Sequence, residues 1–440
     1  MSFPRYAKYK DSGVEWLGEV PEHWVPVRFK RVLRERQERS TDGSELLLSV
    51  SAYTGVTPRS EIIDEGEHLS RAESLEGYKI CRRDDLVINI MLAWNRGLGF
   101  TDYDGIVSPS YSVFRLINES LPRFLNYLVR SDEYTLYFKA FSAGVIDSRL
   151  RLYPETFGQL SCLLPPPDEQ AAIAIFLDRE TEKIDALIAE QHRLIELLQE
   201  KRQAVISHAV TKGLNPDVPM KDSGIEWLGE VPEHWGFGPL KRFWEVIDCK
   251  HVTVPFIDEG FPVASVMEVR EFELDLSQVL RTSEEHFRLL TDGGRQPRRG
   301  DVIYCRNTAN TGTSAYVDTD EPISIGQDVV LIKCKEHNGR FLNYILHSGL
   351  MAAQLETLLV GSTFKRINVA EIRSLAVTCP PKAEQDAIAA FLDARTSDYK
   401  SLSADASSAI TLLQERRSAL ISAAVTGQID VRGLAGSEAA

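Results

Sequence analysis

A long helical pattern, from Asp168 to Thr211, constrains the fold of this chain more than any other feature. Apolar and small side chains recur along it in alternating steps of four and three residues, the spacing of the contact face in a coiled coil. No Gly or Pro interrupts it, Pro165–Pro167 stop a helix from beginning earlier, and Gly213 suits its C-terminal turn. A helix of about 40 residues is ~60 Å long, which exceeds the width of a small domain, so we expect a strut between other parts of the chain. The contact face would consist of Leu177, Thr181, Ile184, Ile188, Gln191, Ile195, Leu198, Arg202, Val205 and Ala209.

The chain contains a second copy of this helix. Glu384-Gln385 follow Pro380-Pro381 just as Glu169-Gln170 follow the first proline run. The second contact face is weaker, because smaller residues stand at Ser403 and Ala406. Two such helices can pair antiparallel and would then hold two other bodies apart. The second contact face would consist of Leu392, Thr396, Tyr399, Ser403, Ala406, Ile410, Leu413, Arg417, Leu420 and Ala424.

A repeated connector divides the chain into two tandem halves. The segment 10–24 returns as 221–235, and the only change is Ile225 in place of Val14. Gly, Pro and two Trp in so short a segment indicate an extended clamp whose aromatic side chains dock on another element, for which the strut is the candidate. We interpret the connector as structural rather than as a binding site.

Each connector precedes a mixed α/β body. In the first, 46–50, 86–90 and 112–116 are typical of strands, and 123–131 and 133–141 of helices. In the second, Asp301–Cys305 and Asp328–Ile332 echo two of those strands, and Arg340–Tyr344 repeats Arg123–Tyr127 letter for letter. Elsewhere the two bodies differ widely. The expected division is a connector at 1–24, a first domain at 25–164, a long helix at 165–213, a connector at 214–235, a second domain at 236–379, a long helix at 380–427 and a flexible tail at 428–440.

Composition sets limits on location and partners. The six Cys are scattered without C-x-x-C pairs, which fits reduced thiols in a cytoplasmic protein and gives no zinc spacing. We find no signal peptide and no apolar run of membrane-spanning length. The net charge of −14 argues against an independent nucleic-acid binder, although the distribution of charge matters more than its sum.

Catalytic motifs are missing from the sequence. The Pro-Pro pairs lack the preceding Asn or Asp and the following aromatic of an adenine methyltransferase loop, and no Gly-rich phosphate loop precedes a Lys-Ser/Thr pair. Asp398-Tyr399-Lys400 matches only half of a nuclease motif. His23 and His234 lack partners at metal spacing, so a structural role is expected for both.

These features together resemble a known family. The words Gly-Glu-Val-Pro-Glu-His-Trp at 18–24 and 229–235 are similar to those of specificity (S, HsdS) subunits of type I restriction-modification enzymes. So are the Pro-Pro…Glu-Gln-x-x-Ile-x-x-Phe-Leu-Asp words that begin each long helix. The resemblance covers nearly the whole chain, with both motifs twice in the same order.

The resemblance implies an α+β fold in which two tandem mixed α/β target-recognition domains are separated by two long antiparallel coiled-coil helices, with a pseudo-two-fold internal repeat. Each domain would read one half of a split, asymmetric DNA target, and the helices would fix the spacing. The subunit would not be catalytic and would bind no cofactor. Two modification subunits would dock on it and methylate adenine N6 with S-adenosylmethionine, and restriction subunits would use ATP and Mg²⁺. Much of the phosphate neutralisation would then come from the partners.

Two polar loops in each domain have the composition that base readout requires. We name them loop A1 (Trp94–Gly97), loop B1 (Ser142–Arg149), loop A2 (Arg306–Ser314) and loop B2 (Gly361–Arg366). For any single residue a solvated turn is the stronger interpretation, whereas for the loops as a group we favour DNA contact. The candidate DNA-binding residues are Asn95, Arg96, Ser148, Arg149, Arg151, Arg306, Asn307, Asn310, Thr311, Thr313, Ser362, Thr363, Lys365 and Arg366.

Leu187, Leu194 and Leu197 lie off the contact face of the first helix and are candidates for binding a modification subunit. Two alternatives remain at this point. The chain could serve another multisubunit restriction-modification system, or it could be a coiled-coil scaffold that binds only protein. The sequence does not reveal the target bases.

Overall fold

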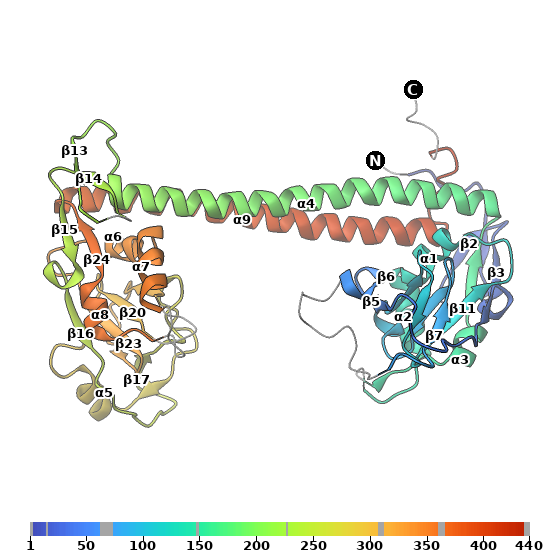
Figure 1. Ribbon diagram of the computed structural model, residues 1–440, viewed down its shortest axis with the longest axis horizontal. Coiled ribbons are helices and arrows are strands. Elements are labelled where there is room, and N and C mark those ends of the chain that lie inside the picture. The colour runs from blue at the N-terminus through green and yellow to red at the C-terminus, as the bar shows by residue number, and fades with distance from the viewer. Residues whose placement is uncertain are drawn as a thin grey trace. The chain divides into compact units, whose positions relative to one another are not determined.

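The computed structural model describes residues 3–14, 16–61, 74–146, 149–225, 228–306, 312–359 and 366–434. The chain divides into two compact units, one formed by Met1–Gln191 with Ser408–Ala440 and the other by His192–Ser407. Helices α4 (Pro167–Lys212) and α9 (Lys382–Val425) each contribute residues to both units (Figure 1). The two long uninterrupted helices expected from the sequence are confirmed.

The first unit is built on a four-stranded antiparallel sheet in the order β4-β11-β8-β9. The strands expected at 46–50, 86–90 and 112–116 are confirmed as β5, β8 and β11, and the helices expected after them as α1 and α2. The elements of this unit besides the long helices are β1 (Tyr9–Asp11), β2 (Glu19–Pro21), β3 (Val25–Arg28), β4 (Leu33–Glu35), β5 (Leu48–Ser51), β6 (Gly55–Pro58), β7 (Lys79–Cys81), β8 (Leu86–Asn89), β9 (Leu98–Phe100), β10 (Gly105–Val107), β11 (Tyr111–Leu116), α1 (Pro122–Arg130), α2 (Asp132–Ala140), α3 (Pro154–Gln159) and β12 (Ser161–Leu164).

The second unit repeats this plan with a five-stranded sheet in the order β16-β23-β20-β21-β18, in which only β18 and β21 run parallel. It also contains α5 and a small sheet, β19-β17-β22, in which β17 and β22 run parallel, as Leu47 and Ile106 do in a single bridge of the first unit. Its elements are β13 (Met220–Asp222), β14 (Glu230–Pro232), β15 (Gly236–Pro239), β16 (Glu245–Asp248), β17 (Phe261–Ala264), β18 (Phe272–Glu273), β19 (Arg281–Thr282), α5 (Glu284–Thr291), β20 (Val302–Cys305), β21 (Ser314–Tyr316), β22 (Ser324–Ile325), β23 (Val329–Lys333), α6 (Gly339–Leu346), α7 (Gly349–Leu359), α8 (Val369–Ser374) and β24 (Ala376–Cys379).

The long helices complete the core of each unit. In the first, Ile184 of α4 and Leu420 of α9 are buried in one cluster with the sheet and α1. In the second, Ile206 of α4 and Leu392 of α9 do the same. The helix segments run antiparallel within each unit (Figure 1). Packing of an apolar face, rather than helix propensity, therefore stabilises these segments.

Each connector docks on the first turn of a long helix through a glutamate. Glu169 is 3% exposed and accepts hydrogen bonds from Trp24 Nε1 (2.9 Å) and the Tyr6 hydroxyl (2.5 Å), while His23 Nε2 lies 2.7 Å from its other oxygen. Burial and the neighbouring carboxylate raise the pKa of Tyr6 far above its ordinary value. The docking of connector aromatics on the strut is thus confirmed, and the histidine has the structural role expected of it.

The second connector repeats the arrangement. Glu384 accepts from Trp235 Nε1 (2.9 Å) and lies 2.6 Å from His234 Nε2, but its side chain is 42% exposed. The neighbouring glutamine also repeats: Gln170 accepts from the backbone N–H of Leu121, and Gln385 from that of Asn338, both at 2.8 Å. The Glu-Gln pair therefore fastens a connector and a domain to the start of each long helix.

None of the helices in the described part of the chain combines the length and the apolar content that crossing a bilayer requires.

The difference in burial between the two glutamates predicts unequal stability losses. We expect Glu169→Ala to lower the free energy of unfolding by about 3 kcal/mol, because it leaves buried donors unpaired. Glu384→Ala should cost only about 1 kcal/mol, because water can replace the lost acceptor. Urea denaturation of the two variants measures both values, with Glu169→Gln as a control that keeps an acceptor for Trp24. Equal losses at the two positions would contradict this account.

Candidate nucleic-acid interface

The two candidate loops of the first domain lie side by side. The backbone N–H of Leu152, just after loop B1, donates to the carbonyl of Ile90, just before loop A1 (2.9 Å). Ala143 and Arg151 exchange two backbone hydrogen bonds that close the base of loop B1. The side chain of Arg151 then reaches toward Met91, with Nη2 at 4.0 Å from Sδ.

The second domain joins its loops by the equivalent bond. The backbone N–H of Ile367, just after loop B2, donates to the carbonyl of Arg306, the first residue of loop A2 (3.0 Å). The carbonyl that accepts follows the same sheet strand in both domains, β8 in one and β20 in the other. Two loops that are far apart in sequence are therefore brought to one edge of each sheet.

The candidate residues of the first domain are mostly at the surface. Asn95 is exposed at the end of a 3-10 turn, Ala93–Asn95, and Arg149 and Arg151 are also exposed. Arg96 has a left-handed backbone (φ 58°) and its guanidinium pairs with Asp132 at the start of α2. Ser148 lies outside the described residues.

In the second domain the two candidate arginines differ. Arg366 is 47% exposed and pairs with Asp328 (2.6 Å). Arg306 is only 8% exposed, and its Nη1 donates to Asp248 (3.0 Å). In this position Arg306 holds two strands together and does not present its guanidinium to a ligand. Thr313 is half-buried, with its carbonyl accepting from the backbone of Cys305, whereas Asn307, Asn310, Thr311, Ser362, Thr363 and Lys365 lie outside the described residues.

One group beside this edge has ligand types that metals use. Ligand atoms of Asp248, Cys249 and His251 lie within 4.8 Å of one another. However, the Asp248 carboxylate already accepts from Arg306 and from His251 Nε2, each at 3.0 Å. A carboxylate neutralised by a guanidinium is a poor ligand for a divalent cation, which disfavours a metal at this place.

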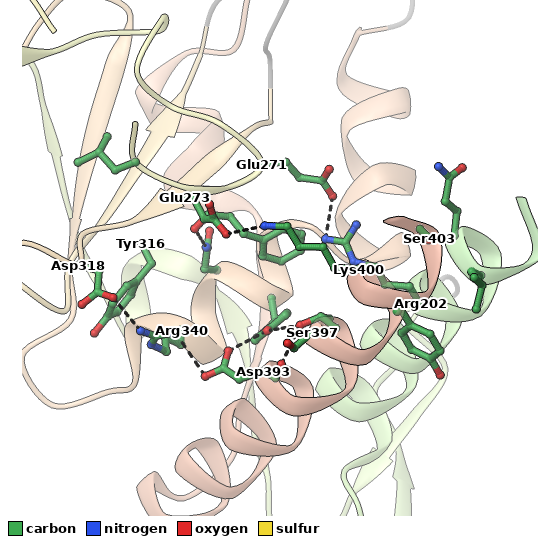
Figure 2. Close-up of a pocket in the computed structure, with 18 of the residues that line it drawn as sticks. Arg202, Glu271, Glu273, Tyr316, Asp318, Arg340, Asp393, Ser397, Lys400 and Ser403 are labelled. Atoms are coloured by element: carbon green, nitrogen blue, oxygen red, sulfur yellow. Dashed lines mark hydrogen bonds and ion pairs between the residues drawn. The ribbon is translucent and has the colours of Figure 1, made fainter. Parts of the chain in front are cut away.

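The second unit also contains a cavity of about 780 Å³ between α4, α9 and the domain body. Figure 2 shows that its charged side chains are paired across it: Arg202 with Glu271 (3.3 Å), Lys400 with Glu273 (3.3 Å), and Arg340 with both Asp318 (3.1 Å) and Asp393 (3.4 Å). Because these pairs link β18 and α6 to the long helices, the cavity walls are tied together by groups of both signs.

His347 lies at the end of α6 in the same unit. Its ring centroid is 4.1 Å from that of Phe272, and its Nε2 is 2.9 Å from the carbonyl oxygen of Ser314. The backbone N–H of Ser314 lies 3.3 Å from the same nitrogen, so His347 contacts both backbone groups of this residue. Burial lowers the pKa of His347, while the hydrogen bond to Ser314 and the charge of Glu271 oppose this shift and the charge of Arg202 adds to it.

Comparisons with known proteins agree with this geometry. A family model described as a type I restriction modification DNA specificity domain matches residues 291–404. The MjaVIII specificity subunit of Methanocaldococcus jannaschii is 24% identical over 325 residues, which cover 69% of this chain and 72% of that protein. The EcoBI specificity subunit of Escherichia coli is 23% identical, with 60% and 58% covered. The chain is therefore similar to specificity subunits of type I restriction-modification enzymes, and its residues 291–404 match their DNA specificity domain.

Solved structures from type I restriction-modification systems share the fold. A chain from a structure that describes complex assembly and conformational transition of a type I restriction-modification system aligns with a TM-score of 0.70 at 17% identity, covering 92% of this chain and 98% of that chain. The HsdS subunit from Thermoanaerobacter tengcongensis aligns at 0.54 and 18%, covering 93% and 98%. The expected α+β fold with paired long helices is therefore confirmed for this chain.

The leucines proposed for partner binding lie on the outside of α4. Leu187, Leu194 and Leu197 are between 42% and 50% exposed. Apolar side chains at this spacing on a helix present a stripe that another helix can cover.

The burial of Arg306 and Arg366 predicts opposite effects for two arginines of the same interface. Arg306→Ala should lower the free energy of unfolding by about 2 kcal/mol, because it leaves Asp248 without its partner. Arg366→Ala should change stability by less than about 0.5 kcal/mol and weaken DNA binding of the assembled complex about tenfold. Urea denaturation and DNA titration measure the two effects, and a stability loss at Arg366 equal to that at Arg306 would contradict the assignment.

The lowered pKa of His347 predicts a pH dependence of stability. Above pH of about 6.5 the histidine is neutral in both the folded and the unfolded chain, so it gives no slope. As pH falls below that value the unfolded chain binds the proton first, and the free energy of unfolding decreases. His347→Gln should remove this part of the slope. Urea denaturation of both proteins between pH 5 and 8, roughly the range in which histidine titrates, measures the difference, and parallel curves would contradict it.

Proposed function

We propose that this specificity subunit selects DNA for a type I restriction-modification complex by reading one half of a split, asymmetric target with each domain. The observation that carries the proposal is the pair of loops at one sheet edge, joined by an equivalent backbone hydrogen bond in both domains. The frame is the same in the two domains, whereas the loop residues differ. Such a design suits two readers of different sequences.

The exposed groups of the loops fit base and phosphate contacts. Arginine recognises guanine in the major groove with two donors, and asparagine recognises adenine in the same way. The exposure of Asn95, Arg149 and Arg151 in one domain and of Arg366 in the other supports such contacts. We infer that Arg96 reaches DNA only if it leaves Asp132.

The remaining functions belong to partners. We propose that two modification subunits dock on α4 and α9, with Leu187, Leu194 and Leu197 in the interface, and that the helices fix the spacer between the two half-sites. S-adenosylmethionine, ATP and Mg²⁺ would be bound by modification and restriction subunits, and this chain would be non-catalytic on its own. The proposed substrate is intracellular DNA, which places the complex in the cytoplasm.

Long-read methylation mapping tests the proposal in cells that express this chain with its modification subunit. We expect a split motif with N6-methyladenine on both strands that disappears when this chain is omitted. An assembled complex that produces no chain-dependent motif would favour a protein-only scaffold. Methylation and cleavage by a single partner chain would instead favour another multisubunit system.

Exchange of one domain should change one half of the motif. If residues 25–164 are replaced by the corresponding domain of another specificity subunit, we expect a new first half-site and an unchanged second half-site, because each unit forms its own core. The reciprocal exchange of 236–379 is the matched control. Methylation mapping of both chimeras measures the outcome, and a change in both half-sites from one exchange would contradict the two-reader design.

A further inference from the structure

The repeated motif Arg-Phe-Leu-Asn-Tyr links each sheet to a long helix. In α1, the Tyr127 hydroxyl donates to Asp178 of α4 (2.8 Å), and Arg123 pairs with the same carboxylate (2.6 Å). In α6, the Tyr344 hydroxyl donates to Asp393 of α9 (2.8 Å), and Arg340 pairs with that carboxylate. Each short helix is therefore anchored at the same two positions.

The asparagine of this motif contacts the strand that follows loop A1 in the first domain and loop A2 in the second. Asn126 accepts from the backbone N–H of Phe100 in β9 (3.0 Å). Asn343 accepts from the hydroxyl of Ser314 in β21 (2.6 Å). The short helix thus connects a long helix on one side with the end of the candidate reading loop on the other.

The residue three positions after the shared tyrosine completes this connection, although its identity differs. Arg130 Nη1 donates to the carbonyl of Leu98, the first residue of β9 (2.7 Å). His347 Nε2 lies 2.9 Å from the carbonyl of Ser314, the first residue of β21. Residues spaced by three share a helix face, so both side chains point to the same place in their domains.

Arg130 also binds the backbone of a second loop. Its guanidinium donates to the carbonyl of Ser51 at the end of β5 (3.4 Å) and to those of Ala52 (2.9 Å) and Tyr53 (3.0 Å) in the β5–β6 turn. It also donates to the carbonyl of Arg96 in loop A1 (3.1 Å). The five donors of a guanidinium suit such a cluster of carbonyls. Burial and the charge of Arg96 lower the pKa of Arg130 to about 10, so it stays charged at neutral pH.

The β5–β6 turn presents an aromatic side chain beside loop A1. Tyr53 is 94% exposed, while its own carbonyl is held by Arg130. A fixed backbone with a free side chain is the arrangement expected of a recognition residue, because the ligand does not have to order the loop. A tyrosine at this place offers both a ring face and a hydroxyl to a base.

We propose that Arg130 and His347 are positioning residues for DNA specificity and that Arg130 adds Tyr53 to the surface with which the first domain reads DNA. Each fixes loop A of its own domain to a helix anchored on α4 or α9. Arg130 forms hydrogen bonds with two loops, whereas His347 contacts one. The proposal rests on the function proposed above, and it assigns a role in specificity to residues that lie outside the four polar loops.

The test uses the full chain in complex with its modification subunit and DNA libraries in which one half-site of the mapped motif is randomised. Tyr53→Ala should relax discrimination in the first half-site about tenfold and leave the second unchanged. Arg130→Gln should do the same, and Arg130→Lys should rescue it only in part, because an ammonium cannot bridge both loops. The double variant should add little to Arg130→Gln, since the two residues act together.

His347 supplies the matched control in the other domain. His347→Ala should relax only the second half-site, and His347→Gln, which keeps a donor, should restore it. Thermal unfolding of each complex separates loss of fold from loss of discrimination. Unchanged discrimination in Tyr53→Ala, or equal loss in both half-sites for Arg130→Gln, would overturn the proposal. A wild-type complex that modifies no motif would instead contradict the proposed function itself.

Discussion

The buried glutamate in the first turn of α4 is the contact on which the attachment of the first connector depends. Glu169 is buried, and the N-terminal end of a helix stabilises an anion there. The carboxylate binds the indole of Trp24, so the connector cannot leave the helix without exposing an unpaired charge to an apolar surrounding. The next residue, Gln170, bonds the backbone just before α1. Two adjacent side chains therefore determine where the connector and the domain attach.

The repeated attachment contacts explain how two domains with different loops are held on the same kind of long helix. The groups that attach a domain to a long helix are repeated within the chain, down to the 2.8 Å bonds of Tyr127 and Tyr344. The groups that shape the reading edge differ, as Arg130 and His347 do. Because the first set does not contact the loops directly, the loops can vary without weakening the attachment. The second sheet of three strands in the second unit is a larger variation of the same kind.

The sequence predicts those parts of the structure that depend on periodicity or on repeated words. The contact face of the long helices, the docking of Trp24 and the main sheet strands all follow from patterns that are local in the chain. Arg306 could not be placed in this way, because its partner Asp248 lies 58 residues earlier and composition alone marked it as a surface donor. Arg130 was not among the candidate residues, because comparison of the two halves identifies only positions with the same amino acid, and Arg130 aligns with His347. The exact repeat of Arg123–Tyr127, which ends three residues before Arg130, is the signal that would have directed attention to it.

The acidic character of the chain becomes understandable at the level of individual pairs. Arg96 and Arg366 lie in the candidate DNA-binding loops, and each is paired with a carboxylate of its own domain, Asp132 or Asp328. A paired guanidinium attracts random DNA less than a free one, because its charge is already compensated. If these arginines contact DNA as proposed, a base or phosphate has to replace the carboxylate, so only a well-fitted site recovers the cost of breaking the pair. With the proposed function, this pairing reduces binding to DNA that is not the target, which is most of the DNA that the protein meets. Phosphate contacts made by partner subunits can supply the affinity that is lost in this way.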